Sequence, residues 1–163
     1  MTKALVVYIF LVVLMIAFSI SNSAIALEMS ETNRTVPLNP SGATTTLTAK
    51  QFMQGQRKFN DSCAQCHIDG GSKTNPDVDL GPLSLANATP SRNSVEAIVD
   101  YLKEPTTYDG LRSLAELHPS MQRADLFPRM RGLTEDDLGA IAGYILTKPQ
   151  TIGEQWAGGK PKR

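Results

Sequence analysis

Both cysteines of this 163-residue chain, and one of its two histidines, lie in the pentapeptide CAQCH at positions 63–67. Residues of these types at this spacing serve three chemistries: a redox-active disulfide, a zinc site, and covalent attachment of haem. A redox Cys-x-x-Cys pair normally belongs to a strand-to-helix junction, whereas here a predicted helix precedes the motif and a loop follows it. A zinc site would use all four side chains, Cys63, Cys66, His67 and His118. Because Cys66 and His67 are adjacent, they suit one tetrahedral ion poorly.

The motif Cys-x-x-Cys-His is the attachment signature of a c-type haem. In such a site the thiols of Cys63 and Cys66 form thioethers with the two haem vinyl groups, and the following His67 binds the iron. The spacing lets both thiols reach one edge of the macrocycle. The sequence therefore predicts one covalently attached haem c with its iron, and a zinc-binding module remains the remote alternative.

His118 is the only histidine outside the pentapeptide, and it is the predicted second axial ligand of the haem iron. Imidazole is an excellent ligand for iron, Pro119 restricts the backbone beside it, and Leu117 offers an apolar neighbour. Many c-type cytochromes use methionine at this position. Met121 and Met130 lie in the same stretch, so they are the alternative ligands, and packing against the haem is their expected role.

An uncharged apolar run at residues 4–20 follows Lys3, and the small residues Ala24 and Ala26 then offer a cleavage site. This pattern predicts a secretory signal peptide at residues 1–26 and one cytochrome c domain at residues 27–163. The apolar run is shorter than the roughly 20 residues that span a bilayer comfortably, although a retained membrane anchor is the alternative. Export suits haem attachment, because an unfolded exported chain keeps its cysteines accessible.

The predicted mature chain has little net charge. Removing Lys3 from the 16 basic residues leaves 15 against 16 acidic ones. A nucleic-acid-binding protein normally shows a basic excess, so we expect no nucleic-acid partner. The length suits a single domain.

The predicted elements are mainly helical and are separated by long loops. Thr48 and Gln51 form a capping-box pattern, and Thr134 begins the best-specified helix. Gly139 and Gly143 in that helix predict a close crossing with the helix that holds Gly55. The predicted elements are a hairpin around residues 36–46, helices at 49–60 and 134–148, a helical turn at 83–87, and a helix that begins at Asn93 and ends before Pro105. We therefore expect a mainly α, single-domain, class I-like cytochrome c fold with a short N-terminal β-hairpin and long loops around a covalently bound haem.

Five stretches of the chain resemble the extrinsic cytochrome c-550 family of photosystem II, in register over essentially the whole of residues 27–163. They are LTAKQFMQGQRKF, CAQCHIDGGSKTNP, ATPSRNSVEAIVDYLKEPTTYDG, AELHPSMQRADLFPRMRGLTEDDL and AIAGYIL. The resemblance implies a low-potential bis-histidine haem, with His67 and His118 as axial ligands and Cys63 and Cys66 as attachment sites.

The resemblance also implies a place and a partner. Members of that family dock on the lumenal face of photosystem II with the other extrinsic subunits and stabilise the oxygen-evolving manganese–calcium cluster and its calcium and chloride requirement. The expected location is the thylakoid lumen of a cyanobacterium or a red-lineage plastid, peripheral to the membrane. The alternative is a soluble lumenal or periplasmic electron-transfer cytochrome c that is not tied to photosystem II. An enzyme is not expected, because two imidazole ligands leave the iron no open position.

Overall fold

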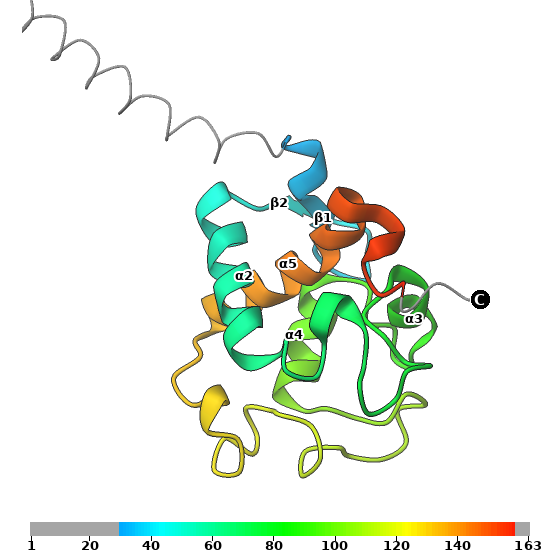
Figure 1. The fold of residues 1–163 in the computed structure, drawn as a ribbon, viewed down its shortest axis with the longest axis vertical. Helices are drawn as coiled ribbons and strands as arrows, with labels where there is room; N and C mark the ends of the chain where they lie inside the picture. Colours follow the sequence, from blue (N-terminus) through cyan, green and yellow to red (C-terminus); the bar gives the residue numbers. More distant parts are fainter. Residues whose placement is uncertain (1–29, 159–163) are drawn as a thin grey trace, which may run out of the picture. The chain divides into compact units, whose positions relative to one another are not determined.

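The computed structural model describes residues 30–158, and the predicted signal peptide at residues 1–26 lies outside them. Four α-helices and one small sheet form the described part of the chain (Figure 1). The helices are α2 (Ala49–Ser62), α3 (Pro82–Asn87), α4 (Val95–Lys103) and α5 (Glu135–Ile152), and the strands are β1 (Thr35–Pro37) and β2 (Thr44–Thr46). Short 3₁₀ turns lie at η2 (Thr32–Arg34), η3 (Ile68–Gly70), η4 (Pro128–Met130) and η5 (Gly153–Gln155). The predicted mainly helical class is confirmed.

The predicted hairpin is confirmed as an antiparallel pair in which Val36 lies opposite Thr45. Its turn is held by the side-chain oxygen of Asn39, which accepts hydrogen bonds from the backbone N–H groups of Ser41 and Ala43 at 3.1 and 3.2 Å. Val36 is only 1% exposed and β1 contacts α5. The hairpin therefore covers one end of the core.

Helix α2 begins at the predicted capping box. The Thr48 side chain accepts a hydrogen bond from the Gln51 N–H, and the Gln51 side chain accepts one from the Thr48 N–H at 2.9 Å. These bonds satisfy backbone donors that the first turn leaves without partners. The helix continues to Ser62 and ends at Cys63, so it delivers the chain directly to the CAQCH motif.

Helices α2 and α5 form the main helix–helix contact of the described chain. At Gly55 an added Cβ would lie 2.0 Å from the backbone oxygen of Ala140, so only glycine permits this approach. The predicted close crossing with the helix that holds Gly55 is confirmed, but neither predicted glycine of α5 makes it. Gly143 instead packs against Leu47, and Gly139 has no heavy atom within 4 Å of the position of a Cβ.

Two predicted helix boundaries are wrong. Helix α4 is capped by Ser94 rather than Asn93, because the Ser94 side chain accepts the Ala97 N–H at 3.3 Å. Helix α5 does not end before Pro149 but continues through it to Ile152. Proline removes one helical hydrogen bond, and here packing of the last turn on the core and the bond from the Gln150 side chain to the Thr35 carbonyl at 3.0 Å offset that loss.

The core lies between α2, α4 and α5, and the C-terminal end of the described chain closes it. Trp156 is 4% exposed, lies against Gly70, and donates its indole N–H to the Leu80 carbonyl at 3.0 Å. The Ala157 N–H donates to the Asp69 carbonyl at 2.7 Å. These contacts fix the loop that follows CAQCH. The core cluster comprises Phe59, Leu85, Ile98, Leu102, Met130, Leu133, Leu138, Ile141, Ala142, Tyr144, Ile145 and Trp156.

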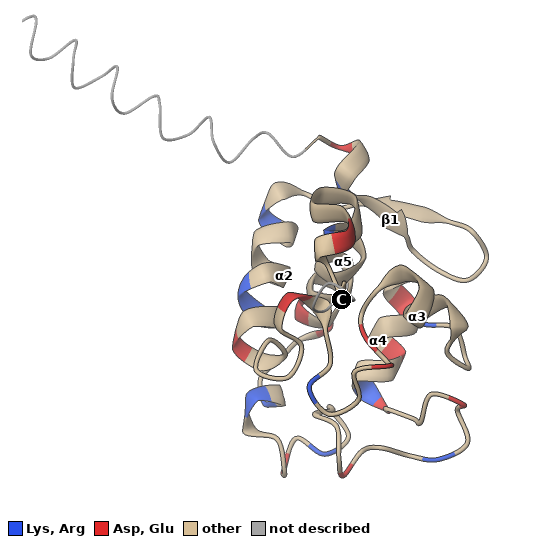
Figure 2. Cartoon of the chain, turned by 45° about the vertical axis from the view of Figure 1, so that its right-hand side comes forward, with Lys and Arg blue, Asp and Glu red and all other residues tan. Residues whose placement is uncertain are grey.

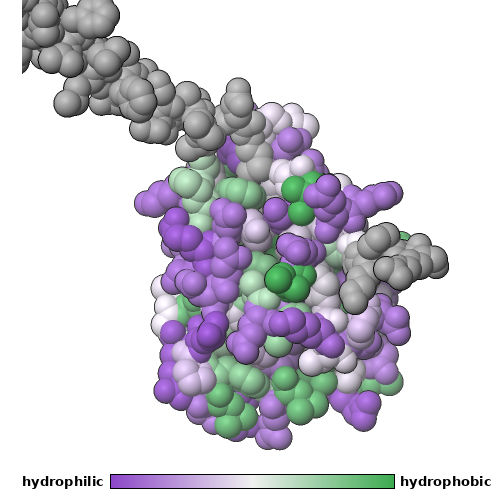
Figure 3. All heavy atoms as spheres, in the orientation of Figure 1, coloured by the Kyte–Doolittle hydropathy of each residue, from purple (hydrophilic) through white to green (hydrophobic). Residues whose placement is uncertain are grey.

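The surface carries mixed charge and an apolar region over one long loop. Figure 2 shows acidic and basic residues interspersed along the helices and loops rather than separated onto two sides. Figure 3 shows hydrophobic surface at the lower edge, over the long loop between α4 and α5. Three leucines of that loop are exposed, Leu111, Leu117 and Leu126. Among residues 30–158, no helix has both the length and the hydropathy needed to cross a membrane.

Candidate functional site

The CAQCH motif forms a tight turn at the end of α2. The Cys63 N–H continues the helix by donating to the Phe59 carbonyl at 2.7 Å, and the N–H groups of Cys66 and His67 both donate to the Cys63 carbonyl, at 3.1 and 2.9 Å. This turn leaves Cys63 half-buried and Cys66 exposed. Burial, and to a lesser degree the neighbouring Cys66, raises the pKa of Cys63 to about 12, so its thiol is neutral in the structure.

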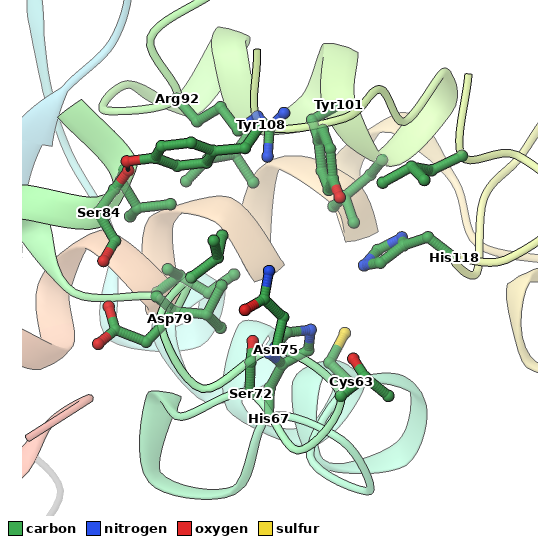
Figure 4. A pocket seen from close by; sticks show the side chains of 18 of the residues that line it. Cys63, His67, Ser72, Asn75, Asp79, Ser84, Arg92, Tyr101, Tyr108 and His118 are labelled. Atoms are coloured by element: carbon green, nitrogen blue, oxygen red, sulfur yellow. Dashed lines mark hydrogen bonds between the residues drawn. The ribbon is translucent and has the colours of Figure 1, made fainter. Parts of the chain in front are cut away.

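The structure brings His67 and His118, 51 positions apart in the sequence, to opposite sides of one space. Their ring centroids are 6.1 Å apart and their planes are inclined by 49°, and Figure 4 shows both rings bordering the same cavity. A histidine nitrogen lies about 2.0–2.1 Å from a bound zinc ion. At a similar distance, two imidazole rings that bind one metal ion from opposite sides have centroids about 6 Å apart. The spacing therefore suits one metal ion between the two rings.

Backbone carbonyls select the ring nitrogen that each histidine presents to the cavity. His67 Nδ1 lies 2.9 Å from the Gly71 carbonyl oxygen and 3.1 Å from the Ser72 hydroxyl. His118 Nδ1 lies 2.9 Å from the Pro119 carbonyl oxygen. An Nδ1–H that donates to a carbonyl leaves Nε2 as the free lone pair, which is the usual outer-shell arrangement of a metal-binding histidine.

Both imidazoles are neutral at pH 7. Burial lowers the pKa of His67, and burial together with the nearby His67 lowers the pKa of His118 to about 4. The neutral ring is the form that binds a metal ion.

Two adjoining cavities meet at this pair, and both are lined by Cys63, His67, Thr74 and His118. They contain about 1040 and 910 Å³ of space between atoms, part of it open to solvent. The wall of the larger cavity includes the apolar side chains of Phe59, Val78, Leu80, Leu85, Ile98, Leu102, Leu114 and Ile145. A flat apolar macrocycle with a metal ion at its centre fits this donor set and this wall.

The loop between α4 and α5 holds His118 in place by backbone hydrogen bonds. The His118 N–H donates to the Leu114 carbonyl at 2.8 Å, and three residues later the Met121 N–H donates to the Leu102 carbonyl of α4 at 3.0 Å. The Tyr101 ring of α4 meets the His118 ring edge-on, with centroids 5.1 Å apart. This irregular segment thus holds His118 by a bond within the loop on one side and a bond to α4 on the other.

The alternative chemistries find less support in this arrangement. Met130 is 2% exposed and belongs to the core cluster, and Met121 packs on the edge of that cluster. Neither methionine lines either cavity. Within residues 30–158 no group of three or more histidine, cysteine or acidic side chains converges on a point that could hold a metal ion, and the two thiols are not joined.

Several polar residues of the cavity wall were missed by the sequence analysis. Arg92, Tyr101, Tyr108, Asn75 and Asp79 all border the larger cavity (Figure 4). They come from four separate segments and form no motif, so no pattern of spacing could have indicated them. Arg92 is the least expected, because a charged side chain only 8% exposed is rare.

Comparisons with known proteins point to one family. The sequence matches the cytochrome c-550 domain family over residues 27–163, a range that includes CAQCH and His118. A photosystem II extrinsic protein V of Porphyra purpurea is 54% identical over 142 residues, 87% of each chain. A protein of the same name from Thermosynechococcus vestitus is 54% identical over 138 residues, 85% of each chain. The crystal structure of a cytochrome c549 superposes with a TM-score of 0.77 at 52% identity, covering 78% of this chain and 99% of that one.

Proposed function

The chain belongs to the cytochrome c-550 family, and from that premise we propose that it carries one covalent haem c and serves as an extrinsic subunit of photosystem II. In this proposal Cys63 and Cys66 hold the haem as thioethers, and His67 and His118 bind its iron from the two sides. The observation that carries the proposal is the pair of neutral imidazoles 6.1 Å apart across an apolar cavity with Cys63 on its wall.

The bound haem supplies a one-electron redox centre. The residues of the chain bind the iron, exclude water and fix the tautomer of each imidazole. His67 and His118 would both hold the iron, which would leave no open position for oxygen or peroxide and would favour an electron-transfer or structural role over catalysis. The apolar wall around Phe59 and Ile98 excludes water, and the carbonyls of Gly71 and Pro119 keep both rings in the binding tautomer.

The proposed location and partner rest on the relatives. Proteins 54% identical to this chain are named photosystem II extrinsic protein V, so we place this protein on the lumenal side of the thylakoid membrane, peripheral and beside the other extrinsic subunits. There it stabilises the oxygen-evolving manganese–calcium cluster and its calcium and chloride requirement. Two strong imidazole ligands and no methionine ligand favour a low reduction potential. The second candidate, a soluble electron carrier unconnected with photosystem II, uses the same haem site.

The first experiment examines the haem of the purified mature protein. We expect a Soret band, a low-spin paramagnetic-resonance spectrum typical of two nitrogen ligands, and haem that stays on the polypeptide in a denaturing gel. Haem that leaves in acidic organic solvent would contradict covalent attachment. Zinc without a Soret band would support the remote alternative.

The second experiment separates the two functions. Photosystem II membranes are washed with concentrated salt, and the released protein and the remaining oxygen evolution are measured at low calcium and chloride. We expect release in a fixed ratio to photosystem II, together with loss of oxygen evolution that the purified protein restores. A pool that is wholly soluble before the wash, with no effect on oxygen evolution, would favour the electron carrier.

A further inference from the structure

A buried arginine lies in the wall of the larger cavity. Arg92 lies two residues before Ser94, the N-cap of α4, is 8% exposed, and is the only lysine or arginine among the described residues that line this cavity. In the view of Figure 4 its guanidinium lies beside Tyr101, across the cavity from Cys63 and His67. Arg92 therefore places a positive charge in the wall of the cavity that His67 and His118 also line.

Neutral groups hold the guanidinium in position. Its Nη2 donates to the carbonyls of Thr106 and Thr107 at 3.0 and 2.9 Å, and its central carbon lies 4.0 Å from the centroid of the Tyr101 ring. The Arg92 backbone N–H also donates to the Leu85 carbonyl at 2.8 Å. These contacts order the side chain but do not neutralise it.

No carboxylate among residues 30–158 forms an ion pair with Arg92; the ion pairs found there involve Lys58, Lys103 and Arg123. Burial lowers the pKa of Arg92, but a guanidinium stays protonated in proteins. A buried charge without a partner is strongly unfavourable. The site therefore suits an anion, which no carboxylate of the described chain supplies.

Two nitrogens of Arg92 remain available for that anion. The hydrogen bonds to Thr106 and Thr107 use only Nη2, and Nε and Nη1 donate to no group recorded in the described part of the chain. No buried side-chain nitrogen there is left unsatisfied, so these two atoms retain access to open space. The guanidinium can thus present a fork of donors to a carboxylate from the cavity side.

We propose that Arg92 binds a carboxylate of the haem and that its charge raises the reduction potential of the iron. The proposal rests on the proposed function, because the haem is the source of the carboxylate. A fixed cation favours the state that carries one more electron, so it stabilises reduced iron relative to oxidised iron. Two imidazole ligands favour a low reduction potential of the haem iron, and Arg92 limits how low that reduction potential becomes.

The test is a redox titration of the mature haem protein at pH 8, where a haem carboxylate stays ionised. Arg92→Gln removes the charge and keeps a polar side chain, and Arg92→Lys keeps the charge. Arg112→Gln is the control, because it removes an exposed arginine from the neighbouring loop. We expect Arg92→Gln to lower the ratio of reduced to oxidised haem at a fixed potential about tenfold, a shift of about 59 mV for one electron.

The two other variants should leave the potential nearly unchanged. An unaltered potential in Arg92→Gln, or an equal fall in Arg92→Lys and Arg92→Gln, would overturn the proposal. A low-spin spectrum must persist in each variant, which shows that both axial ligands are intact. If Arg92→Gln does not fold, Arg92→Lys decides the matter: a wild-type potential supports the proposal, and a fall of about 59 mV or more overturns it.

A free anion from solution is the other source of a negative charge at Arg92. The wild-type potential is therefore measured in chloride and in sulfate at equal ionic strength. Independence of the anion supports the haem carboxylate, and dependence on it would overturn that assignment in favour of a free anion. Absence of covalent haem from the wild type would contradict the proposed function itself. This result is distinguishable from a failure of the Arg92 proposal, because it appears in the spectrum before any titration.

Discussion

At the scale of single residues, the candidate site depends on four side chains that the fold brings to one cavity. Cys63, Cys66 and His67 are adjacent in the sequence and share one turn. His118 joins them only because the loop that carries it is hydrogen-bonded to α4. It is therefore the most informative single residue to change.

Replacing His118 tests its predicted role as second axial ligand. His118→Ala should open one side of the iron, and the spectrum should change from low-spin to high-spin with binding of added imidazole or cyanide. His118→Met should give a higher-potential low-spin haem if the sulfur reaches the iron, because methionine ligation raises the potential. The measurements are visible and paramagnetic-resonance spectra and a redox titration. An unchanged low-spin spectrum and potential in His118→Ala would place the second ligand elsewhere.

The two cysteines should contribute separately to haem attachment. Cys63→Ser and Cys66→Ser should each leave one thioether, so haem should remain on part of the polypeptide in a denaturing gel. The double variant should release the haem entirely. Haem staining of the gel measures the outcome, and full retention in the double variant would contradict the proposed attachment sites.

At the scale of secondary-structure elements, the crossing of α2 and α5 positions the end of α2, from which CAQCH extends. The crossing depends on Gly55, whose Cα hydrogen faces the backbone of Ala140. The Phe59 and Tyr144 rings pack next to it, with centroids 5.3 Å apart. The glycine requirement is therefore local to one contact and can be tested at one position.

Gly55→Ala should destabilise the protein, and Gly139→Ala should not. A Cβ at position 55 would overlap the Ala140 carbonyl, and overpacking of this kind costs about 1–3 kcal/mol. A Cβ at Gly139 meets nothing within 4 Å, so the higher helix propensity of alanine should raise stability by up to about 1 kcal/mol. Urea unfolding followed by circular dichroism compares the two variants. Equal stability would show that α2 and α5 can separate slightly without loss.

At the scale of the whole molecule, a buried carboxylate links α2 to α5. Asp137 is 5% exposed and accepts hydrogen bonds from the Gln54 side chain at 2.8 Å and the Thr134 N–H at 3.1 Å. Lys58 Nζ lies 3.2 Å from its second oxygen. Although burial alone would raise the pKa of Asp137, these partners lower it to about 2.

The stability of the protein should consequently depend on pH below 4. The pKa of Asp137 is lower in the folded chain than its ordinary value of 3.8, so its contribution is present above pH 4 and is lost as the pH falls towards 2. That contribution is about 2 kcal/mol. Asp137→Asn should lower the unfolding free energy at pH 7 and flatten its pH dependence between pH 4 and 2. Asp136→Asn, at an exposed neighbouring position, is the control and should change neither.

Features that depend on neighbouring residues could be predicted from the sequence. The capping box at Thr48, the cap at Thr134, the hairpin around Val36, and the attachment motif all involve groups a few positions apart. The interactions are local. At the N-terminus of a helix, the hydroxyl of the N-cap residue lies close to the backbone N–H three residues later. The resemblance over residues 27–163 then predicted the family, which the comparisons confirm.

Only the tertiary structure decided the contacts and distances between segments that lie far apart in the sequence. The approach of His67 to His118, the burial of Arg92 and the fit of Gly55 against Ala140 all depend on how helices and loops pack. The continuation of α5 through Pro149 belongs to the same class, because packing of the last turn overrides a local preference. Sequence spacing determines which groups a single segment can present, whereas the distances between segments follow from the sum of many contacts across the core.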